Sequence, residues 1–134
     1  LPTLEEVASE MHKRGIEVPA EFQAYPKLWH ALLSEHRAAH DFGIADEEIL
    51  RAIRIHSTGD ADMSRLERIL FVSDYIEPMR SFEGPNELRE LAHRDLDAAF
   101  RRAIEMKLGY IRSQNRPLPP LSARALESAE RDPK

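Results

Sequence analysis

The chain has 134 residues, of which 42% are hydrophobic and 32% are charged, and its formal net charge is −5. This length suits one domain around one core, and the balance of residues excludes a disordered chain. The negative charge argues against non-specific nucleic-acid binding, which usually requires a basic surface. A local cluster of arginine or metal could still hold a small anionic substrate.

Cysteine is absent, so neither a disulfide framework nor a thiolate metal site can form. Any metal would be held by histidine and carboxylate side chains, which suit iron, manganese, zinc or magnesium. No apolar run approaches the ~18 residues of a membrane span, and no signal peptide is visible at Leu1. We therefore expect a cytoplasmic protein with neither membrane nor nucleic-acid partners.

Helical signals recur along the chain while strand signals are nearly absent, which predicts an all-α fold. Thr3 and Glu6 form a capping-box pattern before the first helix, glycines mark several helix ends, and Asp95 caps the longest helix. Residues 115–134 are expected to form a Pro-rich turn and a C-terminal tail, whose short helix either caps the domain or frays. The expected helices span about 4–14, 26–42, 46 to a stop at Gly59, 64–76, 84–92, 95–113 and 122–131.

The helix expected at 64–76 is apolar on nearly every side around a single carboxylate, Asp74. A helix with apolar residues all round is typical of a buried position. A lone buried carboxylate is costly unless it is paired or bound to a metal. Asp74 is therefore predicted to be buried beside a cation. That cation could be a metal or, with equal weight, an arginine such as Arg54 or Arg80.

Histidines on two other expected helices are candidate ligands. His56 faces the expected core and is followed by small polar residues, as a ligand at the floor of a pocket would be. A lone histidine there is more often a packed core residue, but with Asp74 it supplies a common ligand set for iron or manganese. His36 and His40 have the one-turn spacing of a two-histidine site. Arg37 stands where a metalloprotease would have its glutamate, so we expect both to be packing residues.

Several segments between Leu28 and Asp97 keep a common order and spacing. The most specific is the Asp-Tyr-Ile-Glu-Pro-Met-Arg run at 74–80, followed by the His-Ser-Thr-Gly run at 56–59. Others are Leu-Trp-His-Ala at 28–31, Phe-Gly-Ile at 42–44, Asp-Glu-Glu-Ile-Leu at 46–50 and Asp-Leu-Asp at 95–97. Together they resemble the YqeK family of HD-superfamily metallohydrolases, the symmetrical dinucleoside tetraphosphatases.

The resemblance implies an HD-domain helical bundle that forms one domain over residues 1–134. It implies hydrolysis of diadenosine tetraphosphate to two ADP at a centre of two divalent transition-metal ions, iron with manganese as the alternative. It also implies that the metal ligands are His30, His56 and Asp74, the last two being catalytic as well. Residues implied to shape the pocket or bind phosphate are Thr58, Gly59, Glu77 and Arg80. Arg54 is a further candidate, because a guanidinium meets phosphate oxygens in a planar fork.

Two departures from the family pattern leave alternatives open. The family's early histidine and its His-Asp pair have no counterpart, since His40-Asp41 falls in the wrong place, and the pair is expected upstream of Leu1. A small turn of the family is replaced by residues 32–35, where Glu35 could be an added ligand. The alternatives are an HD phosphohydrolase for another nucleotide and a non-catalytic helical binding domain, and a homodimer is left open.

Overall fold

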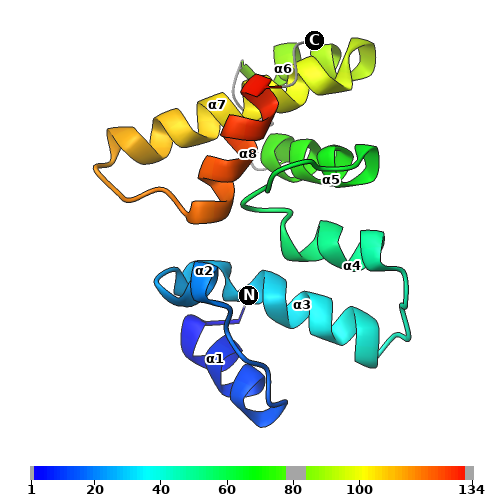
Figure 1. The fold of residues 1–134 in the computed structure, drawn as a ribbon, viewed down its shortest axis with the longest axis vertical. Helices are drawn as coiled ribbons and strands as arrows, with labels where there is room; N and C mark the ends of the chain where they lie inside the picture. The colour runs from blue at the N-terminus through cyan, green and yellow to red at the C-terminus, as the bar shows by residue number, and fades with distance from the viewer. Residues whose placement is uncertain (1, 78–83, 132–134) are drawn as a thin grey trace.

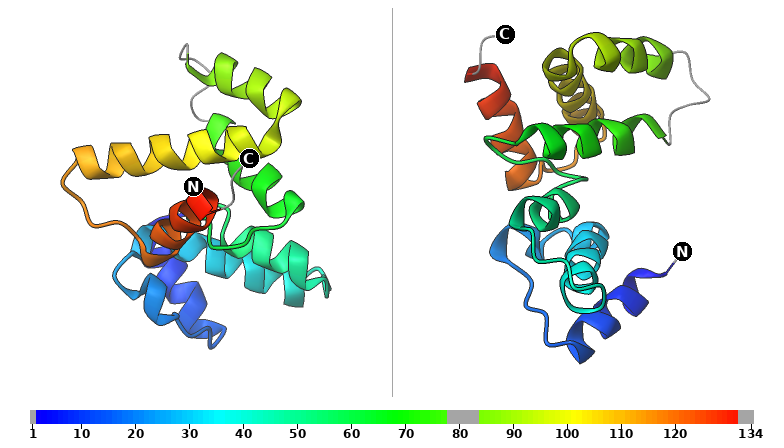
Figure 2. Two further views of the ribbon diagram at one scale, coloured as in Figure 1. Left: turned by 45° about the horizontal axis from the view of Figure 1, so that its top comes forward. Right: turned by 90° about the vertical axis from the view of Figure 1, so that its right-hand side faces the viewer.

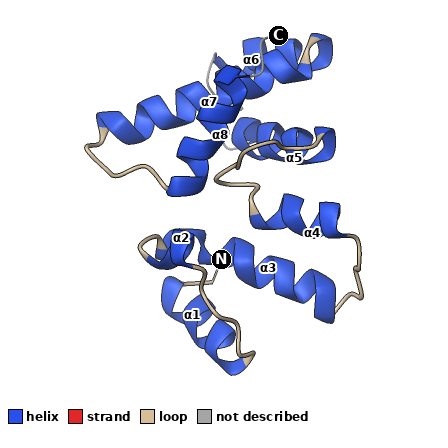
Figure 3. Cartoon of the chain, viewed as in Figure 1, coloured by secondary structure: helices blue, strands red, loops and turns tan. Residues whose placement is uncertain are grey.

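The computed structural model describes residues 2–77 and 84–131 and shows only helices, turns and loops over these residues (Figures 1 and 3). The all-α fold expected from the sequence is confirmed. No described helix has both the length and the apolar character needed to cross a membrane. The elements are α1 (Leu4–Lys13), α2 (Ala20–Gln23), the 3-10 helix η1 (Pro26–Leu28), α3 (Trp29–His40), α4 (Glu47–Arg54), α5 (Arg65–Ile76), α6 (Gly84–Arg94), α7 (Leu96–Ser113) and α8 (Pro120–Arg131).

Side-chain hydrogen bonds cap the starts of α1, α4, α5 and α7. Thr3 and Glu6 form the expected capping box of α1, in which the Thr3 hydroxyl accepts from the Glu6 N–H at 3.1 Å. Ser64 and Glu67 form a second capping box at the start of α5, and the Asp95 carboxylate accepts from a backbone N–H in the first turn of α7. These side chains satisfy donors that have no partner within the helix, which explains why the expected and observed starts agree closely.

The helices form two groups that meet through α4. At one end lie α1, α2 and α3, and at the other lie α5, α6, α7 and α8 (Figures 1 and 2). α4 packs against both α3 and α5, and α7 packs against α5, α6 and α8. The core beside α7 includes Phe71 and Phe100, whose rings meet edge to face with centroids 5.4 Å apart, and the fully buried Ile55, Ile104 and Leu108.

Three features differ from the expectation or settle a choice that the sequence left open. The short helix α2, which begins after Pro19, was not expected. α4 ends at Arg54, so His56 lies in the turn that follows the helix and leads to Gly59, where the backbone is left-handed with φ +71°. The C-terminal helix α8 packs against α7 and buries Leu121, Ser122, Ala125, Ser128 and Ala129.

Candidate functional site

His30 and His56 come together from separate parts of the chain. His30 lies in the first turn of α3 and His56 in the turn after α4. The packing of α3 against α4 brings the two ring centroids to 5.5 Å, with the rings at 75° to each other. His30 is exposed and His56 is half-buried, so solvent reaches the pair. Two of the three expected metal ligands are therefore neighbours, although periodicity along the second expected helix did not single out His30.

Both imidazoles are held by the same kind of hydrogen bond. His30 Nδ1 lies 2.9 Å from the Lys27 carbonyl oxygen, and His56 Nδ1 lies 2.6 Å from the Ile53 carbonyl oxygen. A carbonyl oxygen only accepts, so Nδ1 must donate in each case, and in the neutral ring Nε2 keeps its lone pair. Metal-binding histidines are usually oriented in this way by a backbone carbonyl. The chemistry of this donor pair therefore fits a divalent transition metal.

Asp74 does not have the environment predicted from the sequence. Its side chain is exposed, and on the same helix Ile69 and Leu66 are 42% and 39% exposed. The prediction of a buried carboxylate was wrong, because helices packed on α5 cover only part of its apolar surface. Among the described residues, no three histidine, aspartate or glutamate side chains lie close enough together to hold a metal ion. The part of Asp74 in metal binding remains a prediction.

His36 and His40 lie stacked on α3, with ring centroids 4.1 Å apart. The Arg14 guanidinium approaches His36 Nδ1 at 3.4 Å and donates two hydrogen bonds to the Asp41 carboxylate, at 3.1 and 2.9 Å. Desolvation lowers the pKa of His36, and the neighbouring His40 and Arg14 lower it further. An arginine at this distance would repel a cation bound to His36, which argues against a two-histidine metal site here, whereas His40 itself is exposed.

The residues predicted to bind substrate have several different surroundings. Arg54 pairs with Glu35 at 2.5 Å, and burial raises the pKa of Glu35 against the opposing effect of that arginine. Thr58 is buried, and its hydroxyl donates to the carbonyl of the next residue at 2.9 Å. Glu77 is exposed at the end of α5. Arg80 lies outside the described residues.

Gly59 has a structural reason to be glycine. Its φ of +71° is a conformation that L side chains rarely adopt. A Cβ at this position would also lie 3.0 Å from the Cβ of Ala125 on α8. The glycine therefore lets the turn after His56 pass close to α8.

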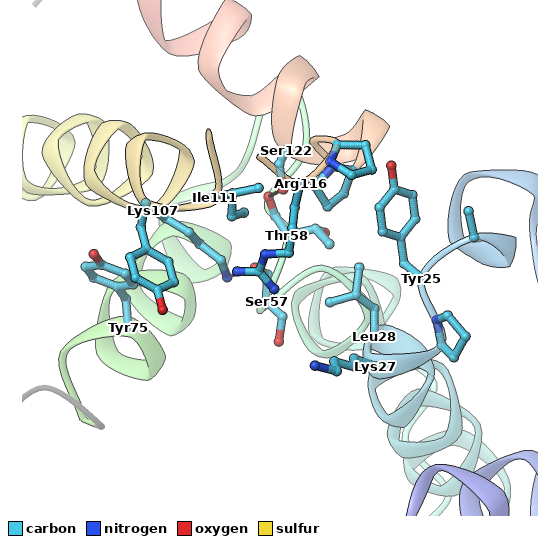
Figure 4. Close-up of a pocket in the computed structure, with 15 residues that line it drawn as sticks. Tyr25, Lys27, Leu28, Ser57, Thr58, Tyr75, Lys107, Ile111, Arg116 and Ser122 are labelled. Carbon is cyan, nitrogen blue, oxygen red and sulfur yellow. Dashed lines mark hydrogen bonds between the residues drawn. The ribbon is translucent and has the colours of Figure 1, made fainter. Parts of the chain in front are cut away.

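A pocket of about 900 Å³ adjoins the sequence neighbours of both histidines. Lys27 and Leu28, which precede His30, line one side, and Ser57 and Thr58, which follow His56, line another. The remaining walls come from the end of α5, the C-terminal half of α7 and the segment that leads into α8 (Figure 4). Most of the lining is apolar.

Three cationic side chains that line this pocket were not identified from the sequence, namely Lys27 of η1, Lys107 of α7 and Arg116 of the following segment. Burial lowers the pKa of the Lys107 ammonium, and the charge of Asp74 acts in the opposite direction. A signal for Lys107 was present, since it lies between Ile104 and Leu108 on the face of α7 that points into the core. A lysine in such a stripe is uncommon unless it has a partner or a function.

Known proteins resemble this chain in sequence and in fold. It is 40% identical over 95 residues to a symmetrical bis(5'-nucleosyl)-tetraphosphatase from Bacillus subtilis, covering 71% of this chain and 51% of that protein. It is 38% identical over 94 residues to a protein of the same name from Halalkalibacterium halodurans, covering 70% and 50%. The chain thus spans about half the length of these curated relatives. No protein-family model matches it.

A solved structure from Clostridium acetobutylicum, described as a predicted HD superfamily hydrolase involved in NAD metabolism, has the same fold. The TM-score is 0.84 at 31% identity, and the match covers 97% of this chain and 69% of that one. The chain therefore belongs to the HD superfamily of hydrolases. The expected HD-domain architecture is confirmed.

Proposed function

We propose that this protein is a metal-dependent phosphohydrolase that cleaves diadenosine tetraphosphate symmetrically into two ADP molecules. The observation that carries the proposal is the histidine pair, in which each Nδ1 donates to a backbone carbonyl and each Nε2 is left as a ligand atom. The names of the curated relatives support the substrate, and the hydrolase fold of the structural neighbour supports the reaction class.

In this proposal His30, His56 and Asp74 hold metal, with iron or manganese as the ion and two ions in the complete centre. A bound divalent ion lowers the pKa of water and neutralises charge on the phosphate under attack. Hydrolysis breaks the central P–O–P linkage of the substrate. The oxygen of one water molecule joins one phosphorus, the bridging oxygen leaves with the other, and two ADP molecules result.

The two carbonyl contacts give this chain its own part in the chemistry. They hold both rings in one tautomer and one orientation before any ion binds, so little ordering is needed on binding. Thr58, Gly59, Glu77 and Arg80 shape the pocket or contact phosphate in this proposal. Arg54 contributes through its ion pair with Glu35, which lies between α3 and α4, the two elements that bring the histidines together.

We further propose that the physiological partner is a small nucleotide rather than nucleic acid or membrane, and that the protein is cytoplasmic. The negative net charge supports the first statement, because it leaves little general attraction for polyanions. A homodimer remains one proposed state, and sedimentation velocity of the purified chain tests it directly.

The test is to load metal-free protein with Fe²⁺ under anaerobic conditions or with Mn²⁺, then to measure bound metal and nucleotide products. ADP is expected as the sole product of diadenosine tetraphosphate. Loss of a hydrogen bond that supports a metal ligand typically lowers metal affinity roughly 10–100-fold. His30→Gln and His56→Gln remove a ligand itself, so each should lower metal affinity by at least that factor. His12→Gln, which changes an exposed histidine on α1, should leave both measurements unchanged.

Each other outcome rejects a defined part of the proposal. Formation of ATP and AMP would reject symmetrical cleavage. Faster turnover of a different nucleotide would favour the alternative of an HD phosphohydrolase with another substrate. Failure to bind either metal or to release product would favour a non-catalytic helical binding domain.

A further inference from the structure

The pocket beside the histidine pair combines cations with aromatic and apolar walls. Figure 4 shows the side chains of Lys107 and Arg116 extending from different segments toward the same region, near Ser57. Tyr25 and Tyr75 stand on opposite sides of this region. A pocket with apolar walls and a few convergent polar groups is the usual form of a small-molecule site. Here the convergent groups are both positive, so the ligand should carry negative charge.

Lys107 is held in the pocket by neutral partners. Its ammonium donates to the Ser57 carbonyl and lies over the Phe71 ring, 5.3 Å from the centroid. Neither of these two partners carries a negative charge, while the charge of Asp74 acts on the ammonium through space and offsets part of the cost of its burial. One hydrogen bond also uses only one of its three donors. Donors of the ammonium that face the pocket can therefore contact an anionic group bound there.

Arg116 supplies a second cation from the segment between α7 and α8. Its guanidinium lies over the Tyr110 ring, 5.9 Å from the centroid, while the residue as a whole is exposed. A guanidinium stacked on a ring keeps its edge N–H groups available for a bidentate contact with phosphate. The Lys107 ammonium and the planar Arg116 guanidinium can thus both contact a phosphate group in the same region.

We propose that this pocket binds one nucleoside phosphate arm of the substrate, with Lys107 and Arg116 contacting the phosphate and the tyrosine-bearing walls contacting the nucleoside. The proposal rests on the proposed function for the identity of the substrate and deepens it by naming the residues that recognise the arm. The alternative is a purely structural lysine that ties α7 to the turn after His56 through the Ser57 carbonyl.

The experiment measures binding to metal-free protein by calorimetry, with ADP, adenosine and pyrophosphate as probes and EDTA present. Wild-type protein should bind ADP more tightly than adenosine. Lys107→Met keeps the apolar stem and removes the charge, and it should weaken ADP binding about tenfold or more, which is the usual cost of one charged hydrogen bond. Adenosine binding should be unchanged. Arg116→Gln should act in the same direction, and because this residue is exposed, the variant should fold normally.

Arg112→Gln is the matched control, since it removes the same charge from an exposed position of α7 outside the pocket lining. Lys107→Arg should retain part of the ADP affinity. Unchanged ADP affinity in Lys107→Met and Arg116→Gln would overturn the proposal, and so would an equal loss in Arg112→Gln. A lowered melting temperature of Lys107→Met with unchanged ADP affinity would identify the structural lysine.

The failure of this proposal is distinguishable from failure of the proposed function. Binding in EDTA does not depend on hydrolysis, so phosphate-dependent ADP binding without any turnover would reject the enzyme and keep the pocket. Turnover of diadenosine tetraphosphate with an unchanged KM in Lys107→Met would keep the enzyme and reject the pocket.

Discussion

Gly59 provides a sharp test of how the turn after His56 is built. Substitution by alanine places a non-glycine residue at φ +71°, which costs roughly 1–2 kcal/mol. The new Cβ also lies 3.0 Å from the Ala125 Cβ, and overpacking of this kind costs typically about 1–3 kcal/mol. The Gly59→Ala variant should therefore lose about 2–5 kcal/mol of its free energy of unfolding.

Gly43→Ala is the matched control. Gly43 has nearly the same backbone angle, φ +70°, but a Cβ there would meet nothing within 4 Å. Only the backbone cost of roughly 1–2 kcal/mol should appear. Urea unfolding followed by far-UV circular dichroism measures both variants. At an m-value of about 2 kcal/mol/M, the midpoint should fall by about 1–2.5 M for Gly59→Ala and by about half that or less for Gly43→Ala.

A double-mutant cycle with Ala125→Gly separates the steric contribution from the backbone contribution. Ala125→Gly alone should cost about 1 kcal/mol, because glycine is less favourable inside a helix. In the Gly59→Ala background it should cost less than that or restore stability, since it removes the contacting methyl group. Equal destabilisation by Gly59→Ala and Gly43→Ala, together with additive behaviour in the cycle, would refute the close packing of this turn against α8.

Three further predictions concern other parts of the molecule. Asp74→Asn should change the free energy of unfolding by no more than about 0.5 kcal/mol, because the side chain is exposed. Its metal content should fall. A large loss of stability in the metal-free variant would contradict the prediction that Asp74 acts in metal binding rather than in folding. Replacing His36 and His40 together by Gln should leave metal content unchanged, and loss of metal would reject their packing role. Hydrogen bonds from Arg14 lower the pKa of Asp41 below its ordinary value of 3.8, so this carboxylate contributes stability above that pH and loses it as pH falls through the lowered pKa. In Arg14→Met the melting temperature should decline less steeply below about pH 4 than in wild type, and identical acid profiles would exclude this contribution.

The sequence located most helices because their ends are set by contacts between residues a few positions apart. The Thr3–Glu6 capping box and the Asp95 cap are formed as their spacing predicted. The short helix α2 was missed, since four residues carry too little periodicity to stand out. The family resemblance, carried by residues 56–59 and 74–80 among others, predicted the HD fold that the structural comparison confirms.

Burial and convergence were decided by tertiary structure, because they depend on which elements cover a residue rather than on its own neighbours in sequence. Asp74 is exposed although the residues around it are apolar, since α5 is covered on only part of its surface. His30 reaches His56 through the packing of α3 on α4, and no periodicity in one helix encodes that contact. Lys107 likewise lines the pocket because α7 packs beside the turn that contains Ser57. The sequence by itself determined where the chain is helical and supplied the histidines, while the packing of the helices determined which side chains share a site.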